Sequence, residues 1–229
     1  MNKPGALLAS GRDADIFEYG DALVLRRSRE RRSMVEEARV MTYVRKLGYP
    51  VPEIHEVSAD GMDMVMERIE GPSMLELVSK DPSTLLEQAV SLRTLHQLLH
   101  GLEAPPWLRA TPFAAEGNSL LHLDLHPINV MVSDDGPVVI DWARPARGNA
   151  YADVALTWLL LSSGEVSGTQ EEVELMNLGR ALFVETFLEG FDREELAAQL
   201  PAVVKWKVAD PHMSPVERDA MRKLLSDNQ

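Results

Sequence analysis

The stretch "LHLDLHPINVMVSDDGPVVIDWARP", residues 121–145, carries the strongest chemical pattern in the chain. Two short apolar runs, "NVMV" and "PVVID", flank the turn-forming letters "SDDG", and this arrangement predicts a β-hairpin. Polar side chains precede the hairpin, begin its first strand and end its second. They are His122, Asp124, His126, Asn129 and Asp141. Three interpretations follow: a phosphoryl-transfer site, a zinc hydrolase site, or a polar hairpin whose residues only cap turns.

The order of Asp124, Asn129 and Asp141 favours phosphoryl transfer. That chemistry needs one carboxylate to orient the attacking hydroxyl and accept its proton. It also needs hard oxygen ligands to hold Mg²⁺ against the nucleotide phosphates. A loop that leads into a hairpin can present an amide oxygen from one strand and a carboxylate from the next. We therefore expect Asp124 to be the base, with Asn129 and Asp141 as the metal ligands.

The zinc hydrolase interpretation rests on His122, Asp124 and His126, which alternate in sequence. If the segment is extended, these side chains point to one face and could hold Zn²⁺. The sequence contains no H-E-x-x-H motif, and this interpretation leaves Asn129 and Asp141 without roles. The third interpretation, turn capping, explains single residues but does not explain why they occur together.

The first 70 residues are predicted to form a small β-rich lobe with one helix. A helical spacing brings Val35, Ala38, Met41 and Val44 to one face, and Gly48 is a stop signal. Short apolar runs bounded by Gly and Asp are typical of strands. The predicted strands span 5–10, 14–20, 22–27, 51–58 and 62–69, and the predicted helix spans 32–48.

A larger, mostly helical lobe is predicted for residues 71–229, after the breakers Gly71 and Pro72. Asp81 and Pro82 are typical of a helix start, and Leu85, Val90, Leu92, Leu95 and Leu99 supply an apolar stripe. The predicted helices span 81–102, 151–162, 171–190, 193–206 and 214–225. The fold class is therefore α+β, with two lobes and the hairpin in the second.

The motifs "HLDLHPINVMV", "VVIDWARPARGNAYADVAL" and "DMVMERIEG" resemble those of the aminoglycoside phosphotransferase family and its choline-kinase-like relatives, which have a protein-kinase-like fold. The resemblance covers roughly residues 10–165. It implies Asp124 as catalytic base, Asn129 and Asp141 as Mg²⁺ ligands, and Asp153 as a brace of the catalytic loop through backbone amides. It implies a structural role for His122, while His126 either contacts substrate or phosphate or stabilises the loop.

In the first lobe, the resemblance places Arg26 where the family carries a phosphate-binding lysine. Glu37 is then its expected ion-pair partner, with Glu36 as the alternative, and the backbone groups of Glu67 and Ile69 are expected to contact a purine ring. The expected nucleotide is ATP, with GTP left open. Arginine grips phosphate with a different geometry from lysine, and no G-x-G-x-x-G motif is present.

Only 11 residues separate Asp141 from Asp153, which leaves no room for the activation segment of a protein kinase. We therefore expect a small-molecule hydroxyl as acceptor, such as an aminoglycoside, an amino alcohol or an amino sugar. The main alternative is a nucleotide-binding module without transferase activity, which the irregular glycine loop and Arg26 would suit.

The net charge of −13 argues against a nucleic-acid partner. Residues 1–70 hold 13 acidic and 11 basic side chains, whereas residues 71–229 hold 23 and 12, so the acidic second part could attract a cationic acceptor. The chain has no cysteine, and its longest apolar run, "VALTWLLL", has 8 residues, which predicts no membrane partner and a cytoplasmic location. No oligomeric state follows from the sequence.

Overall fold

The computed structural model describes residues 3–29, 31–113 and 116–228. The chain forms two compact units, each built from two segments. The first unit combines Met1–Pro72 with Val130–Arg144, and the second combines Ser73–Asn129 with Pro145–Gln229.

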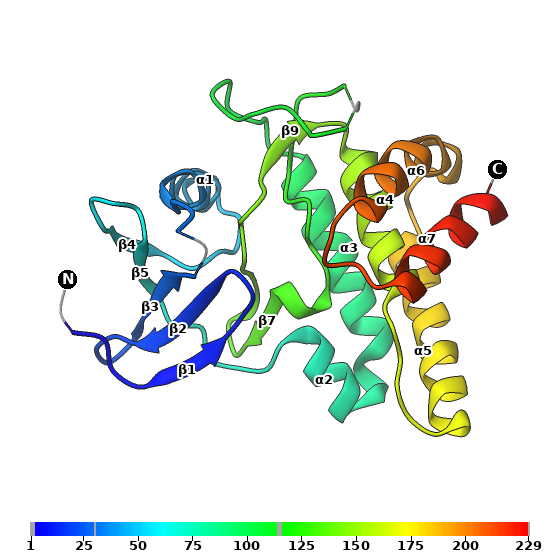
Figure 1. Cartoon of the computed structure of the whole chain (residues 1–229), viewed down its shortest axis with the longest axis horizontal. Helices are drawn as coiled ribbons and strands as arrows, with labels where there is room; N and C mark the ends of the chain where they lie inside the picture. The colour runs from blue at the N-terminus through cyan, green and yellow to red at the C-terminus, as the bar shows by residue number, and fades with distance from the viewer. Residues whose placement is uncertain (1–2, 30, 114–115, 229) are drawn as a thin grey trace. The chain divides into compact units, whose positions relative to one another are not determined.

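A five-stranded antiparallel sheet forms most of the first unit (Figure 1). Its strands fall where the sequence predicts them, as short apolar runs: Val24 and Leu25 are both buried, and so are Met64 and Val65. In spatial order the strands are β1 (Leu7–Ser10), β2 (Ala14–Glu18), β3 (Leu23–Ser28), β5 (Asp63–Glu67) and β4 (Ile54–Val57).

The helix α1 (Val35–Lys46) completes the core of this unit. Val40, Met41 and Val44 are almost fully buried, and each stabilises the fold by about 1.5–3 kcal/mol. Val35, which the predicted stripe includes, is instead 52% exposed. The predicted positions repeat every three residues, whereas an α-helix has 3.6 residues per turn, so the predicted stripe moves around the helix axis. Val40 faces the core in place of Val35.

The predicted hairpin is confirmed as β7 (Val130–Ser133) and β8 (Gly136–Val139). It belongs to the first unit, although the sequence placed it in the second lobe. The reason is hydrogen bonding to the chain before residue 73: the Val132 N–H donates to the Pro72 carbonyl at 2.8 Å, and the Val139 N–H donates to the Pro50 carbonyl at 2.9 Å.

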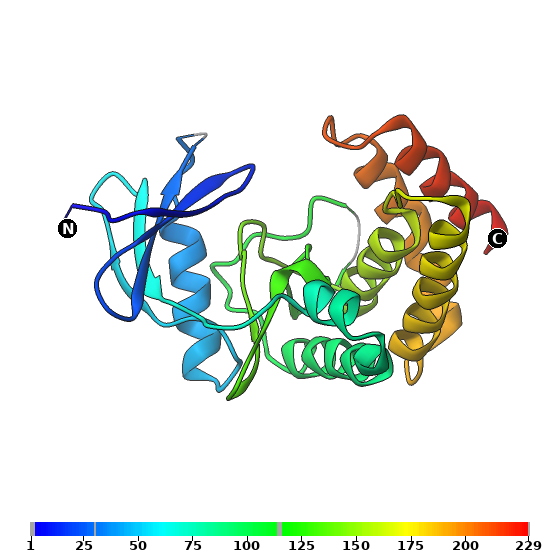
Figure 2. The same cartoon turned by 90° about the horizontal axis from the view of Figure 1, so that it is seen from below.

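The second unit is mainly helical, and α4 is its central element (Figures 1 and 2). Apolar residues surround almost the whole of α4, which packs against α5, α6 and α7, so this helix is buried on nearly all sides. The helices and 3₁₀ turns are α2 (Met74–Lys80), η1 (Pro82–Thr84), α3 (Leu85–His100), η2 (Pro127–Asn129), α4 (Ala150–Ser163), α5 (Gln170–Leu188), α6 (Arg193–Val208) and α7 (Pro215–Asp227).

Three helices or strands of this unit have no counterpart in the sequence prediction. The helix α2 has only 7 residues, too few to show periodicity, and begins at a Ser73–Glu76 capping box. The strands β6 (Ser119–Leu121) and β9 (Ala146–Gly148) have 3 residues each and exist only because they pair with each other.

The start of α3 also differs from the prediction. Asp81 caps the 3₁₀ turn η1 rather than α3, since its carboxylate accepts the Ser83 N–H. Val90 of the predicted apolar stripe is 39% exposed, while His96 occupies a fully buried position on the same helix. The inner face of α3 is therefore partly polar.

Within the described residues, every helix is too short or too polar to cross a membrane.

Candidate active site

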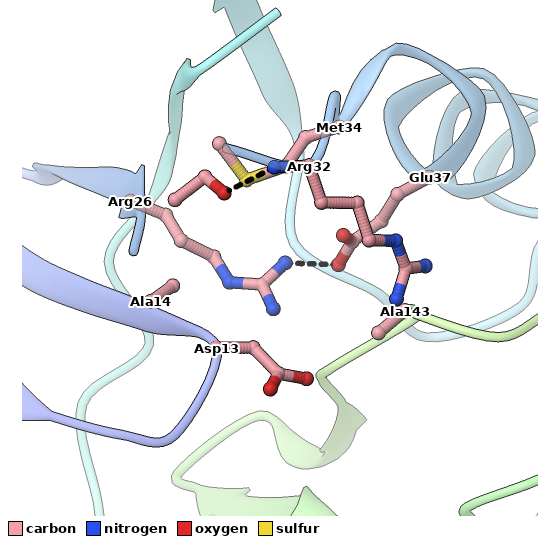
Figure 3. A pocket seen from close by; sticks show the side chains of 8 residues that line it. Asp13, Ala14, Arg26, Arg32, Met34, Glu37 and Ala143 are labelled. Atoms are coloured by element: carbon pink, nitrogen blue, oxygen red, sulfur yellow. Dashed lines mark hydrogen bonds and ion pairs between the residues drawn. The ribbon is translucent and has the colours of Figure 1, made fainter. Parts of the chain in front are cut away.

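Three charged side chains, from β3, α1 and the segment after β8, meet in the first unit, and Figure 3 shows two of them, Arg26 and Glu37. Arg26 on β3 donates through Nη1 to Glu37 in the first turn of α1. Its Nη2 donates to Oδ1 of Asp141, just after β8, at 2.9 Å. One guanidinium therefore joins the sheet, the helix and the hairpin. Its planar fork suits two carboxylates at once, which a lysine ammonium would not match in geometry.

Burial and charge act against each other in this cluster. Burial raises the pKa of Glu37, and the Arg26 guanidinium opposes that rise. For Arg26, burial lowers the pKa, but the charges of Glu37 and Asp141 outweigh it, so the net shift is upward. Arg26 therefore stays charged and supplies the positive charge that the two acids need.

A small cavity of about 20 Å³ adjoins Arg26, and Asp13 from the loop before β2 points toward it (Figure 3). That volume holds about one water molecule, whereas ligand pockets usually exceed about 300 Å³. Side chains from the loop, β3 and α1 fill the space around the guanidinium. The lining residues are Asp13, Ala14, Arg26, Ser28, Arg32, Met34, Glu37 and Ala143.

Asp141 ends the hairpin in an unusual backbone conformation. Its φ of +60° lies in the left-handed region, which non-glycine residues rarely adopt outside constrained sites. The next residue, Trp142, is fully buried, packs edge-on against Tyr49 at 5.8 Å and donates from Nε1 to the Val139 carbonyl at 3.2 Å. Trp142 anchors the chain after the bend, while the Asp141 side chain stays 37% exposed.

Asp124, His126 and Asn129 lie together in the loop of the second unit that ends in η2. The Asn129 amide donates from Nδ2 to the Asp124 carbonyl at 2.9 Å and to its Oδ2 at 3.3 Å. The His126 Nε2 lies 3.6 Å from Asp124 Oδ1. Because Nδ2 of Asn129 points into the loop, the oxygen of the same side-chain amide points away from the loop. The Asp124 side chain is 35% exposed, enough to meet a substrate.

Asp153 holds this loop from the start of α4. Its Oδ1 accepts the Leu123 N–H at 2.8 Å, and its Oδ2 accepts the His122 N–H at 3.1 Å. Burial alone would raise the pKa of Asp153, but the hydrogen bond and charge of His100 hold it well below its usual value. His122 is fully buried, and its backbone N–H contacts this carboxylate.

The two residues expected to contact a purine ring lie at the end of the sheet. Glu67 is the last residue of β5, and its backbone N–H donates to the Glu53 carbonyl at 2.8 Å, so that N–H is engaged within the unit. Ile69 follows β5 and is partly buried. A contact with a nucleotide base stays a prediction for both.

The family model described as "Phosphotransferase enzyme family" matches this chain over residues 5–117 and 102–199. The chain belongs to the phosphotransferase enzyme family.

Solved structures agree with this family in their fold. One is a choline/ethanolamine kinase family protein from Mesorhizobium loti, with a TM-score of 0.62 and 14% identity over 99% of this chain and 87% of that one. Another is a thermostable mutant of aminoglycoside phosphotransferase APH(4)-Ia in ternary complex with AMP-PNP and hygromycin B, with a TM-score of 0.67 and 13% identity over 96% and 92%. The protein-kinase-like α+β fold expected from the sequence is thereby confirmed.

A curated relative is the probable bifunctional tRNA threonylcarbamoyladenosine biosynthesis protein of Methanosphaera stadtmanae. It is 20% identical over 171 residues, which are 74% of this chain. This phosphotransferase family member spans only 27% of the length of that relative.

His96 and His100 of this phosphotransferase are site residues that the sequence analysis missed. The His100 Nε2 lies 3.0 Å from Asp153 Oδ2, and the His96 Nε2 lies 3.3 Å from the Leu125 carbonyl in the loop that carries Asp124. A usable signal was present, because His96 lies on the apolar face of α3, where a polar side chain needs a partner.

The alternative zinc interpretation finds no cluster of its three residues in the part of the chain that the structure describes. Among the residues that the structure describes, His96, His100 and Asp153 converge as a group of three metal-ligating side chains, rather than His122, Asp124 and His126. The 3.0 Å between His100 and Asp153 is a hydrogen-bond distance, shorter than the roughly 3.3 Å between two ligands of one tetrahedral Zn²⁺. We therefore interpret this group as a hydrogen-bonded cluster.

Proposed function

We propose that this phosphotransferase transfers the γ-phosphoryl group of ATP to a hydroxyl group of a small molecule. Asp124 accepts the hydroxyl proton as the oxygen attacks the γ-phosphorus, and the bond from that phosphorus to the leaving oxygen of ADP breaks. The observation that supports this best is the Arg26 guanidinium held between Glu37 and Asp141, because residues from β3, α1 and the end of the hairpin build one charged centre.

The donor set suits Mg²⁺. Asp141 offers a carboxylate with more than a third of its side chain exposed, and Asn129 offers an amide oxygen that does not face into its own loop. Mg²⁺ prefers such hard oxygen ligands and keeps several waters. When bound, it would neutralise charge on the phosphates. Arg26, steadied by Glu37, would contact those phosphates, and the backbone of Glu67 and Ile69 would contact the purine.

The remaining loop residues have supporting roles in this proposal. Asp153 and the His122 backbone keep the loop in place, so that Asp124 is presented at a constant position. His126, whose ring lies beside Asp124, contacts substrate or phosphate. The acceptor class covers aminoglycosides, amino alcohols and amino sugars, and its cationic members suit the net charge of −13.

The test is ADP formation with Mg²⁺-ATP, and separately with Mg²⁺-GTP, across aminoglycosides, choline, ethanolamine, amino sugars and homoserine. Asp124→Asn should lower kcat about 10²- to 10⁴-fold, because a positioned general base contributes that much. Asp135→Asn makes the same chemical change at the exposed turn of the hairpin and should leave kcat unchanged. Nucleotide should still raise the melting temperature of the Asp124→Asn protein.

Two outcomes would count against the proposal. An unchanged rate in Asp124→Asn would remove this residue from the chemistry. A nucleotide-dependent rise in melting temperature without phosphoryl transfer to any acceptor of these classes would instead support a nucleotide-binding module.

A further inference from the structure

The last residue of α3, His100, is buried against the carboxylate that holds the catalytic loop. Its Nε2 lies 3.0 Å from Oδ2 of Asp153, and the side chains of the two residues are 8% and 1% exposed. Both belong to the second unit, as does the loop itself. A buried carboxylate is stable only where donors satisfy its oxygens. His100 supplies a side-chain donor to this group at 3.0 Å.

Three donors divide the two oxygens of Asp153 between them. Oδ1 accepts the Leu123 N–H at 2.8 Å. Oδ2 accepts the His122 N–H at 3.1 Å and faces the His100 Nε2 at 3.0 Å. Two backbone hydrogen bonds thus connect the carboxylate to the loop, and the imidazole limits how the carboxylate can rotate. Without the imidazole, Oδ2 would keep the longer of the two backbone bonds, and Nδ1 of His96, at 4.0 Å, lies beyond hydrogen-bond distance.

The loop needs such support because Leu123 has a left-handed backbone. Its φ is +62°, a conformation in which a non-glycine Cβ is crowded, and the side chain is only 2% exposed. The Leu123 N–H donates to Asp153, which holds the residue in this conformation. The next residue in the chain is Asp124, so the bend at Leu123 sets the direction in which Asp124 leaves the loop.

We propose that His100 is a positioning residue for phosphoryl transfer, acting through Asp153 and the bend at Leu123 on the placement of Asp124. The proposal rests on the proposed function of Asp124. Its physical basis is that a displacement of about 1 Å in a reacting group lowers a rate about 10²-fold.

The test compares variants that keep or remove the donor. His100→Gln retains an amide N–H at similar reach, whereas His100→Leu removes it. We expect kcat of His100→Leu to fall about 10- to 100-fold with the nucleotide KM within about threefold of the wild type, and His100→Gln to recover most of the loss. His100→Asn, one methylene shorter, should resemble His100→Leu and replaces it if the leucine variant does not fold.

The matched control is Leu99→Ala, which opens a cavity next to His100 in the same helix and removes none of the three hydrogen bonds to Asp153 described above. Assayed below its melting temperature, it should keep kcat within about twofold of the wild type. If Leu99→Ala lost as much kcat as His100→Leu, the loss in His100→Leu would come from a destabilised α3 and not from the missing donor. That result would overturn the proposal.

Hydrogen exchange at the backbone amides of His122 and Leu123 gives a readout that does not depend on activity. These amides should exchange at least about tenfold faster in His100→Leu than in the wild type or His100→Gln. If the wild type transfers phosphate but the His100 variants match it in kcat and exchange, the positioning role is wrong and the function stands. If no acceptor is phosphorylated, unchanged exchange still overturns the role, and faster exchange still supports it.

Discussion

Two buried acidic side chains, Glu37 and Asp153, are stabilised by different kinds of donors. Glu37 has a guanidinium as its partner, and burial still raises its pKa. Asp153 has two backbone N–H groups and an imidazole, and its pKa is held well below the usual value. Several short hydrogen bonds to the charged form can outweigh burial. The acid that supports the loop is therefore kept ionised by local geometry.

His96 should make the protein sensitive to mild acid. Burial lowers its pKa from 6.5 to about 3, so between these values the unfolded chain binds a proton that the folded chain does not. Stability is therefore present above pH 6.5 and is lost as the pH falls. From pH 7 to pH 5 this residue should remove about 2 kcal/mol from the free energy of unfolding.

Urea denaturation at the two pH values measures this effect. His96→Gln keeps an N–H donor for the Leu125 carbonyl but does not titrate, so its stability should change by about 2 kcal/mol less than that of the wild type over this range. An identical pH dependence in the two proteins would show that His96 is not the group responsible.

At the scale of elements, the hairpin β7–β8 depends on a close approach at Gly71. A Cβ on Gly71 would lie 2.1 Å from the Val132 carbonyl oxygen, and the φ of +126° also disfavours a side chain. Gly71→Ala should therefore lower the free energy of unfolding by about 3 kcal/mol and speed hydrogen exchange at the Val132 amide, which donates to Pro72.

The hairpin itself contains the control for this prediction. Gly136 has a similar φ of +115°, but a Cβ there would meet nothing within 4 Å. Gly136→Ala should therefore cost only about 1 kcal/mol, the strain of the backbone alone. Equal losses in the two variants would mean that the contact with Val132 is unimportant.

At the scale of the whole molecule, the net charge of −13 bears on the acceptor. Several acidic residues of the second unit have local partners: Glu172 caps α5, Asp192 caps α6, Asp210 pairs with Lys207, and Glu165 accepts from Ser214. Attraction of a cationic acceptor would then come from the summed field more than from any of these side chains.

That field should show in the salt dependence of the acceptor KM. For a polycationic acceptor, raising the ionic strength from about 20 to 200 mM should increase KM roughly threefold or more, because salt screens exposed charges. A neutral acceptor sugar assayed in parallel should show little change. A KM for the polycation that does not depend on salt would exclude steering by the acidic surface.

Local chemistry explains what could be predicted from the sequence. The hairpin is predicted by its apolar runs and its turn-forming residues, and the strands and long helices are predicted by periodicity and capping residues. The loop around Asp124 is also local, since Asn129 reaches the Asp124 carbonyl from only five residues away. The motifs around this hairpin resemble those of a known family, and that resemblance predicted the family and the fold.

Tertiary structure alone decided the contacts between distant residues. Arg26 and Asp141 are 115 positions apart, and His100 and Asp153 are 53 apart. The sequence does not show whether a histidine on a helix faces water or a buried carboxylate. The strands β6 and β9 form because they pair with each other. Such contacts depend on hydrogen bonds that form when the chain is already compact, so periodicity and local propensity carry no signal for them.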